Sequence, residues 1–312
     1  MTESQYTPPL PGRASTQCFC CHSTDLEREW AATSPFFAQR ALRRQPQAIM
    51  LIKCLGCGTR YFDFSPTKDE LDRLYAGYRD DEYFVQRNSF EPWYTRAVNN
   101  DLGAEAQMQT RRAVLRDALE ERGAAKHFEN ILDHGGDKGQ MLRQLTARTK
   151  AVYDISGIPP EEGVIAIDQT QLKEIPWNLI LSCHVLEHLP DPQSYLEELV
   201  ALGRPGTIYF FEVPDENFRS FALSPAFVQK RWIGWLAERM FAFKIFDFLS
   251  TACRVKLRVL PPLCFVALRE HLSFFSTQGL SRLLQNNQLA LLSVKIRASG
   301  HICAVAMKAA AN

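Results

Sequence analysis

A glycine-rich turn between two short apolar runs constrains this chain most, and it lies within residues 130–154. The first run ends in Asp133, and the second ends in Asp154, 21 residues further on. Three glycines fall in or just after the turn: Gly135, Gly136 and Gly139. Such a turn lets backbone N–H groups approach a ligand, and a carboxylate after the second strand can accept both ribose hydroxyl protons. The pattern predicts a nucleoside-cofactor site in a doubly wound sheet, with a helix beginning near Gln140.

The alternation of strands and helices continues to the end of the chain. Three further apolar runs predict strands at 163–167, 178–182 and 207–213. Helices are expected at 191–202 and 277–286, and the last two apolar runs, 289–296 and 302–307, predict a hairpin antiparallel to the rest. The expected fold class is therefore α/β, with a doubly wound and mostly parallel seven-stranded sheet.

Five of the nine cysteines are crowded near the N-terminus, and four of these form two CxxC pairs: Cys18, Cys21, Cys54 and Cys57. Two such pairs can supply the tetrahedral sulfur shell that suits Zn²⁺. Gly58 fits the tight turn after the second pair, and a loop is expected around 34–47. The spacing predicts a zinc ribbon over 17–65 with Cys20 as a spare thiol. A set of buried or incidental cysteines is the alternative.

The charge of the chain limits the kinds of partner that it is expected to bind. The 312-residue chain has a net charge of +1, and within the ribbon the basic residues exceed the acidic ones by only two. That excess is too small for a phosphate-backbone footprint, so nucleic acid is not expected as the partner. We expect the ribbon to staple the fold or to serve as a substrate platform.

The sequence shows no basic N-terminal segment followed by an apolar one, and no long uncharged apolar run. Neither a secretory signal nor a transmembrane helix is therefore expected. Nine cysteines without an export signal favour reduced thiols or metal ligands over disulfides. These features predict a cytoplasmic protein, with a location at the membrane periphery as the alternative.

Residues 66–125, between the ribbon and the glycine turn, are expected to be helical and are dense in aromatic residues. Most of these rings should pack the ribbon against the main domain. The alternative is a lid over the cofactor or substrate that includes Arg79 or Arg87. A flexible tail at 1–16 and a cofactor domain at 126–312 complete the expected organisation.

Residues 108–308 resemble the class I S-adenosylmethionine-dependent methyltransferases. The resemblance rests on LDHGGDKG at the glycine turn, on the acid of VYDIS, and on NLILSCHVLEHLPDP, which is the most specific match. RPGTIYFFEVPDE and HLSFFSTQGLSRLL resemble later motifs of the same family. The paired CxxC motifs resemble the branch with an N-terminal zinc-binding domain, which is often associated with sugar and surface-polysaccharide modification.

The resemblance implies S-adenosylmethionine as the cofactor. Its expected contacts are Asp133, Gly135, Gly136, Gly139, Asp154, Asp168, Gln169 and Ser182. By the resemblance, the methionine moiety would lie against Asp133 and Gly135, the ribose against Asp154, and the adenine against Asp168 with Gln169. A helix cap after a strand is the structural alternative for Asp154.

Two residues depart from the family's pattern. Asp137 stands where a third glycine is usual, so the turn must be rebuilt locally. Asn178 stands where the fourth strand usually opens with an aspartate. Both departures leave in place the acids that are expected to hold the ligand.

Methyl transfer is largely a positioning problem, and a general base is needed only when the acceptor is a hydroxyl or a carbon acid. His184, His188 and His271 fall at predicted strand ends facing the cofactor, and histidine suits proton transfer near neutral pH. Each of the three has a structural alternative, which is strongest for His188 because a partner within its turn can satisfy the ring. Acceptor hydroxyls could be bound by Glu187, Glu212 or Asp215, although Glu212 could equally cap the sheet edge.

An insertion at 224–260 carries seven aromatic residues and seven Lys/Arg against two acids. It is expected to be a cap helix on the domain, a membrane-surface element, or a cover for a lipid-linked or phosphorylated acceptor. The sequence as a whole predicts methyl transfer to a small-molecule or glycan acceptor, favouring a sugar or surface-polysaccharide pathway. An RNA methyltransferase and a non-catalytic scaffold are the alternatives.

Overall fold

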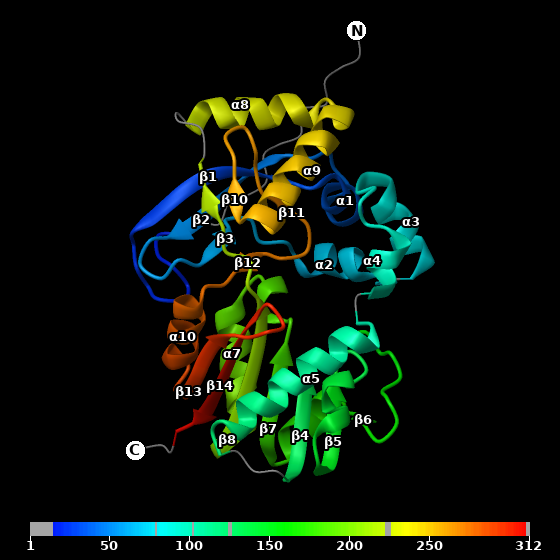
Figure 1. The fold of residues 1–312 in the computed structure, drawn as a ribbon, viewed down its shortest axis with the longest axis vertical. Helices are drawn as coiled ribbons and strands as arrows, with labels where there is room; N and C mark the ends of the chain where they lie inside the picture. Colours follow the sequence, from blue (N-terminus) through cyan, green and yellow to red (C-terminus); the bar gives the residue numbers. More distant parts are fainter. Residues whose placement is uncertain (1–14, 79, 102, 124–126, 222–225, 310–312) are drawn as a thin grey trace.

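The computed structural model describes residues 15–78, 80–101, 103–123, 127–221 and 226–309. Within these residues the strands form sheets of seven, five and two strands. Figure 1 shows the seven-stranded sheet toward one end of the long axis and the five-stranded sheet in the other half. Most of the predicted tail and Arg79 of the lid alternative lie outside the described residues.

The seven-stranded sheet has the order β13-β14-β8-β7-β4-β5-β6, and the predicted fold class is confirmed. Its strands are β4 (Phe128–His134), β5 (Ala147–Tyr153), β6 (Ile165–Ala166), β7 (Trp177–Cys183), β8 (Gly203–Pro214), β13 (Leu289–Ile296) and β14 (His301–Lys308). The strands β6, β5, β4, β7 and β8 pair in parallel. The closing hairpin forms as predicted, but only β14 opposes its neighbour β8; β13 is antiparallel to β14 and therefore runs with the others.

Helices cover both faces of this sheet because successive strand residues point to opposite sides. Ile131 packs in one cluster with Leu115 of α5 (Glu105–Glu120). Its neighbour Leu132 packs in another cluster with Leu196. The helices of that second face are α6 (Gln169–Glu174), α7 (Pro192–Leu202) and α10 (Thr277–Asn286).

The helix expected near Gln140 is only a short 3₁₀ helix, η2 (Gln140–Gln144). The reason is length, because β5 already begins at Ala147 and leaves too little chain for an α-helix. The short connection keeps the glycine turn tightly between β4 and β5.

The five-stranded sheet combines two distant parts of the chain. Its order is β11-β1-β2-β3-β12. The strands are β1 (Leu26–Thr33), β2 (Ala48–Cys54), β3 (Arg60–Phe62), β11 (Ala267–Leu268) and β12 (Ser273–Phe274). The predicted ribbon is thus completed at both edges by strands from the other half of the sequence. Where a loop was expected, the chain forms α1 (Pro35–Phe37) and a π-helical turn, η1 (Ala38–Leu42).

The remaining helices pack around the five-stranded sheet. They are α2 (Lys68–Tyr75), α3 (Asp81–Phe90), α4 (Arg96–Asp101), α8 (Ala226–Ala237) and α9 (Met240–Leu257). The insertion therefore forms two helices, which Figure 1 shows at the end of the molecule away from the seven-stranded sheet. In the part of the chain that the structure describes, no helix is both long and apolar enough to cross a membrane.

Candidate active site

The glycine turn brings the backbone against a buried carboxylate. Asp133, the last residue but one of β4, has no exposed surface, and neither of its carboxylate oxygens has a hydrogen-bond partner among the described residues. A Cβ on Gly136 would stand 2.2 Å from Asp133 Cγ, so only glycine fits there. Burial raises the pKa of Asp133 to about 7, and the charge of Arg111 opposes that rise. A buried carboxylate that accepts no hydrogen bond costs folding free energy in the free protein. It therefore suits a ligand that donates a hydrogen bond to it.

The rebuilt turn is closed by Asp137, which takes the left-handed conformation (φ 54°) that glycine usually provides. Its backbone N–H donates to Asp154 Oδ2 at 2.9 Å. The N–H of Ser156 donates to the other oxygen at 2.8 Å. Asp154 therefore caps the following loop and not a helix as the structural alternative expected, and each carboxylate oxygen has a second lone pair for a ribose hydroxyl.

The predicted adenine contacts lie in a more open position. Asp168 is exposed and caps α6, accepting from the N–H groups of Thr170 (2.8 Å) and Gln171 (2.9 Å) through Oδ1. Gln169, the first residue of that helix, is exposed as well. Gly139 has a positive φ of 72° and lies close to Val164, so it closes the turn on the side toward β6.

The second departure from the family pattern lies away from this edge. Asn178 is exposed near the start of β7, and its side-chain oxygen accepts from the backbone N–H of Asn130 at 3.0 Å. Both residues lie toward the N-terminal ends of parallel strands, opposite the edge that carries Asp133 and Asp154. The substitution therefore links two strands and does not alter the cofactor edge.

Ser182 is buried in β7 and begins a hydrogen-bonded chain that sequence reasoning missed. Its hydroxyl lies 3.0 Å from the hydroxyl of Tyr195, which in turn lies 2.9 Å from Nδ1 of His134. Burial lowers the pKa of His134 to about 4, so its ring is neutral at physiological pH. His134 follows Asp133 directly in the glycine-turn motif and could have been noticed, whereas Tyr195 lies on α7 without a sequence signal.

His184 belongs to a group fixed by a buried glutamate. Glu212 accepts from Nε and Nη2 of Arg111 (2.8 and 2.6 Å) and lies 2.8 Å from Nδ1 of His301. Burial opposes ionisation of Glu212, but His301 and Arg111 outweigh it and lower its pKa to about 2. His184 follows β7 with a positive φ of 57°, and its ring lies 4.5 Å from that of His301. The carboxylate of Glu212 is therefore buried and bound by Arg111 and His301, so it is not accessible to a methyl acceptor.

His188 and His271 face each other in a second group, with ring centroids 4.8 Å apart. Nδ1 of His271 lies 2.5 Å from Glu216 Oε2. Burial lowers the pKa of His271, but the Glu216 carboxylate outweighs it and raises the pKa to about 9. Burial and the nearby positive charge of His271 instead lower the pKa of His188. One ring is thus an imidazolium at neutral pH and the other is neutral.

Hydrogen bonds define the tautomer of His188. Its Nδ1 lies 3.1 Å from the backbone oxygen of Glu270, which can only accept, so Nδ1 carries the proton. The hydroxyl of Tyr75 lies 2.9 Å from the same nitrogen. The structural alternative expected a partner within the turn itself; the partner is instead a backbone oxygen 82 residues away, and it leaves the Nε2 lone pair for another proton.

The helical segment before the glycine turn contributes to this group. Arg87, named in the lid alternative, is buried and lies 2.5 Å from Glu270, as does the hydroxyl of Tyr83. Behind them Arg269 joins Glu91 (2.6 Å) to Asp247 of α9 (2.7 Å). These contacts hold the segment against the strand β12 region as fixed structure.

The cofactor turn lies against the loop that carries the histidines. A Cβ on Gly135 (φ 76°) would stand 2.6 Å from Val185, which lies between His184 and η3 (Leu186–His188). The N–H of Leu272 donates to the backbone oxygen of Glu187 at 2.7 Å, so the five-stranded sheet docks on the same loop. Glu187 is buried, and its Oε2 has no partner among the described residues.

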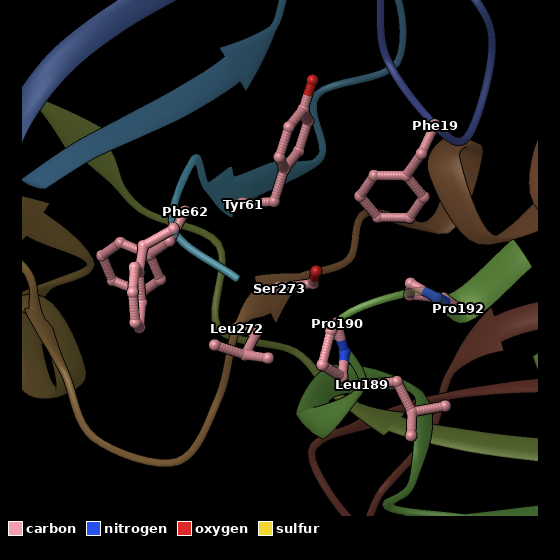
Figure 2. Close-up of a pocket in the computed structure, with 9 residues that line it drawn as sticks. Phe19, Tyr61, Phe62, Leu189, Pro190, Pro192, Leu272 and Ser273 are labelled. Atoms are coloured by element: carbon pink, nitrogen blue, oxygen red, sulfur yellow. The ribbon is translucent and has the colours of Figure 1, made fainter. Parts of the chain in front are cut away.

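Figure 2 shows a small pocket beside this junction, between strand β3, the loop before α7 and strand β12. Its lining contains no charged residue: Phe19, Tyr61, Phe62, Phe64, Leu189, Pro190, Pro192, Leu272 and Ser273. The pocket therefore supplies no charged catalytic group.

The four predicted cysteine ligands converge. Their sulfur atoms lie within 4.8 Å of one another, with Cys18 3.7 Å from Cys57 and Cys21 3.5 Å from Cys54. Sulfurs of a tetrahedral zinc site with Zn–S bonds of 2.3 Å would stand about 3.8 Å apart, so the set fits Zn²⁺. Cys20 lies outside this group and donates its backbone N–H toward Cys18 Sγ at 3.4 Å.

Both CxxC pairs have the same local geometry. His22 and Gly58, the residues directly after each pair, have positive φ angles of 59° and 80°. Their N–H groups return to the carbonyls of Cys18 (2.9 Å) and Cys54 (2.8 Å). Two matching turns present the thiols from opposite sides of one point.

Both histidine groups also bring potential metal ligands within 4.8 Å of each other. In the first, Arg111 occupies Glu212 as a fixed cation. In the second, the imidazolium of His271 is paired with Glu216. A further cation would be repelled at either place, so we interpret both groups as proton-holding networks.

Comparison with known proteins agrees with this arrangement. A family described as a methyltransferase domain matches residues 105–294, from the start of α5 into β13. No curated protein sequence matches the chain.

Several solved structures are similar to the chain at low identity and low TM-score. Magnesium protoporphyrin IX methyltransferase from Synechocystis, with bound S-adenosylhomocysteine, is 12% identical over 69% of this chain and 89% of that one (TM-score 0.39). An S-adenosylmethionine-dependent methyltransferase from Clostridium acetobutylicum is 9% identical over 70% and 99% (0.39). The N-methyltransferase NodS from Bradyrhizobium japonicum is 13% identical over 66% and 99% (0.36).

Proposed function

The chain belongs to the methyltransferase-domain family and is an S-adenosylmethionine-dependent methyltransferase, and from that premise we propose that it methylates a hydroxyl of a small-molecule or glycan acceptor. The observation that carries the proposal is the contact between the glycine turn and the histidine loop through Gly135 and Val185. This contact places the glycine turn, where the nucleoside cofactor would bind, next to the loop that carries His188, whose neutral imidazole can take a proton.

The cofactor would be held at the carboxyl edge of β4, β5 and β6. Gly135 and Gly136 leave no room for a Cβ, which lets a ligand approach the backbone of the turn. The unpartnered carboxylate of Asp133 would accept from the ammonium group of the methionine moiety, and Asp154 from the ribose hydroxyls. Bound there, the cofactor would supply an electrophilic methyl group.

We assign His188 as the general base. Its pKa is lowered, its Nδ1 proton is held by the Glu270 carbonyl, and its Nε2 can accept the proton of an acceptor hydroxyl. His271 keeps its own proton and would stabilise a developing negative charge on the acceptor oxygen. Tyr75 positions His188 through the contact at Nδ1.

We propose that zinc staples the N-terminal sheet to the methyltransferase domain. Ser276, at the start of α10, donates through its hydroxyl to the backbone oxygen of Cys57. At the other end of α10, the side-chain amide of Asn286 donates to the backbone oxygen of Cys20 at 3.0 Å. The two cysteine turns that would hold the metal are thus hydrogen-bonded to both ends of helix α10.

A sugar or surface-polysaccharide acceptor is favoured because the near-neutral charge gives little attraction for a polynucleotide. The test uses zinc-loaded protein with methyl-labelled S-adenosylmethionine and pools of nucleotide sugars, oligosaccharides and RNA. We expect label in a saccharide, with transfer reduced about a hundredfold or more by His188→Gln, as for loss of a general base. Label in RNA would favour the nucleic-acid alternative, and binding without transfer to any pool would favour a scaffold.

A further inference from the structure

Helix α9 (Met240–Leu257) has an apolar face on the outside of the protein. Five of its exposed apolar side chains, at relative positions i, i+4, i+7, i+8 and i+14, lie on one side of the helix, whereas Leu257 at its last residue does not. Their exposed fractions are high: Phe241 80%, Ile245 43%, Phe248 46%, Leu249 45% and Val255 60%. A surface helix normally turns such a stripe inward; here Phe248 contacts the ring of Trp93 at a centroid distance of 5.4 Å, but the stripe as a whole stays exposed.

The opposite face of α9 is already used by the fold. Phe243 packs with Phe265 at a centroid distance of 5.1 Å, and Asp247 pairs with Arg269. Both Phe243 and Asp247 are buried. The helix cannot rotate to hide its outer stripe without breaking these contacts, so the exposure is built into the fold.

Helix α8 (Ala226–Ala237) adds to the same end of the molecule. Phe227 is 61% exposed and Trp235 is 44% exposed. Figure 1 shows α8 lying across the end of the long axis, with α9 beside it. Phenylalanine and tryptophan at such a surface suit the boundary between headgroups and acyl chains.

Charge decides which partner suits this surface. Residues 226–258 contain seven Lys/Arg and two acids. Lys230, Arg231 and Lys256 form no salt bridge with any described residue. A second copy of the chain would bring these like charges together, whereas anionic headgroups would neutralise them.

We propose that α8 and α9 dock the protein on a bilayer that contains anionic lipid, with the outer stripe of α9 inserted at the interface. The inner side of α9 reaches the site described above. Arg254 contacts Glu216 at 3.1 Å, and Glu216 in turn holds His271. One helix, about 10–12 Å across, therefore separates the bilayer surface from the histidine group. If the proposed function holds, this placement suits an acceptor presented at the membrane.

The test is flotation of the zinc-loaded 312-residue chain with vesicles of phosphatidylcholine, with and without phosphatidylglycerol. We expect binding to the anionic vesicles that weakens as salt is raised. Phe241→Ser should weaken it about tenfold through lost apolar insertion, and Lys256→Glu should reduce it through lost charge attraction. Ile296→Ser, a loss of similar apolar exposure on β13, is the matched control and should change nothing.

The readout does not depend on methyl transfer, so failure of the proposed function leaves it intact. Phe241 is mostly exposed, so its replacement should leave the thermal unfolding curve unchanged. Equal vesicle binding by the wild type and Phe241→Ser would overturn the proposal. A wild-type dimer that Phe241→Ser converts to a monomer, without vesicle binding by either, would assign the surface to a second copy instead.

Discussion

The backbone N–H of Asp137 donates to Oδ2 of Asp154 across the glycine turn, at 2.9 Å. One carboxylate therefore has two tasks, since it closes the turn that would cradle the cofactor and would bind the cofactor's ribose. This contact explains how the turn can do without a third glycine, because Asp154 fixes the backbone that glycine would otherwise leave free.

Asp137→Gly should stabilise the protein slightly. The left-handed conformation at Asp137 costs a non-glycine residue about 1–2 kcal/mol, and the greater freedom of glycine in the unfolded chain removes up to about 1 kcal/mol of the gain. Chemical denaturation should show an increase of up to about 1 kcal/mol in the free energy of unfolding, with cofactor affinity retained. Gly135→Ala, which would clash with Val185, is the opposite control and should lose affinity.

Asp133→Asn should raise the stability of the fold at pH 8 and weaken the binding of S-adenosylmethionine. The folded pKa of Asp133 is about 7, above its unfolded value near 3.9, so the buried carboxyl destabilises the fold increasingly as the pH rises from about 4 through 7. The amide removes that penalty, so the variant should melt at a higher temperature at pH 8 and show little difference at pH 4. Calorimetric titration should show weaker S-adenosylmethionine binding. Tighter binding by the variant would contradict the role assigned to Asp133.

Zinc analysis should give one metal ion per chain. Cys54→Ser should lose it, whereas Cys20→Ser should keep it, because Cys20 lies outside the four-sulfur group. Removal of the metal should cost at least about 3 kcal/mol of stability, since structural zinc sites contribute that much or more to folding. Equal zinc content in the two variants would refute the ligand set.

The pair formed by His271 and Glu216 should make stability depend on pH. The folded pKa of His271, about 9, lies above its unfolded value near 6.5. Its contribution is therefore fully present below about pH 6.5 and is lost as the pH rises through about 9. His271→Gln should lower the free energy of unfolding by about 3 kcal/mol at pH 6, since each pKa unit corresponds to about 1.4 kcal/mol, and by little at pH 10.

The control for this comparison is His127→Gln, because His127 is exposed and forms no salt bridge with any described residue. It should show no such pH-dependent difference. A constant deficit for His271→Gln between pH 6 and 10 would mean that lost packing, and not the ion pair, explains the effect.

Local patterns made much of the fold predictable. The alternation of apolar runs located the strands, and α10 and β13 lie where the sequence placed them. The two CxxC pairs identified the sulfur group because their spacing sets the local geometry by itself. The sequence offered a helix cap as the alternative role of Asp154, but no helix follows it, and the carboxylate caps the next loop instead.

Contacts between distant segments could not be predicted. Strands β11 and β12 are two residues each, too short to show a period, and they pair with β1 and β3 only because the fold brings them there. Tyr75, Tyr195 and Arg111 reach the site from helices, where their periodicity indicates only packing. The sequence therefore named candidate histidines but could not tell which ring is neutral and which is charged.

The most direct test of the account is calorimetric titration of S-adenosylmethionine into zinc-loaded wild type and Asp154→Asn. Asparagine keeps the shape of the side chain and one acceptor oxygen, so the turn should persist while the charge-assisted hydrogen bonds to ribose are lost. We expect wild-type binding on the order of micromolar and a loss of about tenfold or more in the variant, as for hydrogen bonds to a charged group. Absence of binding by the folded wild type, or equal affinity in both proteins, would contradict a cofactor site built on Asp154.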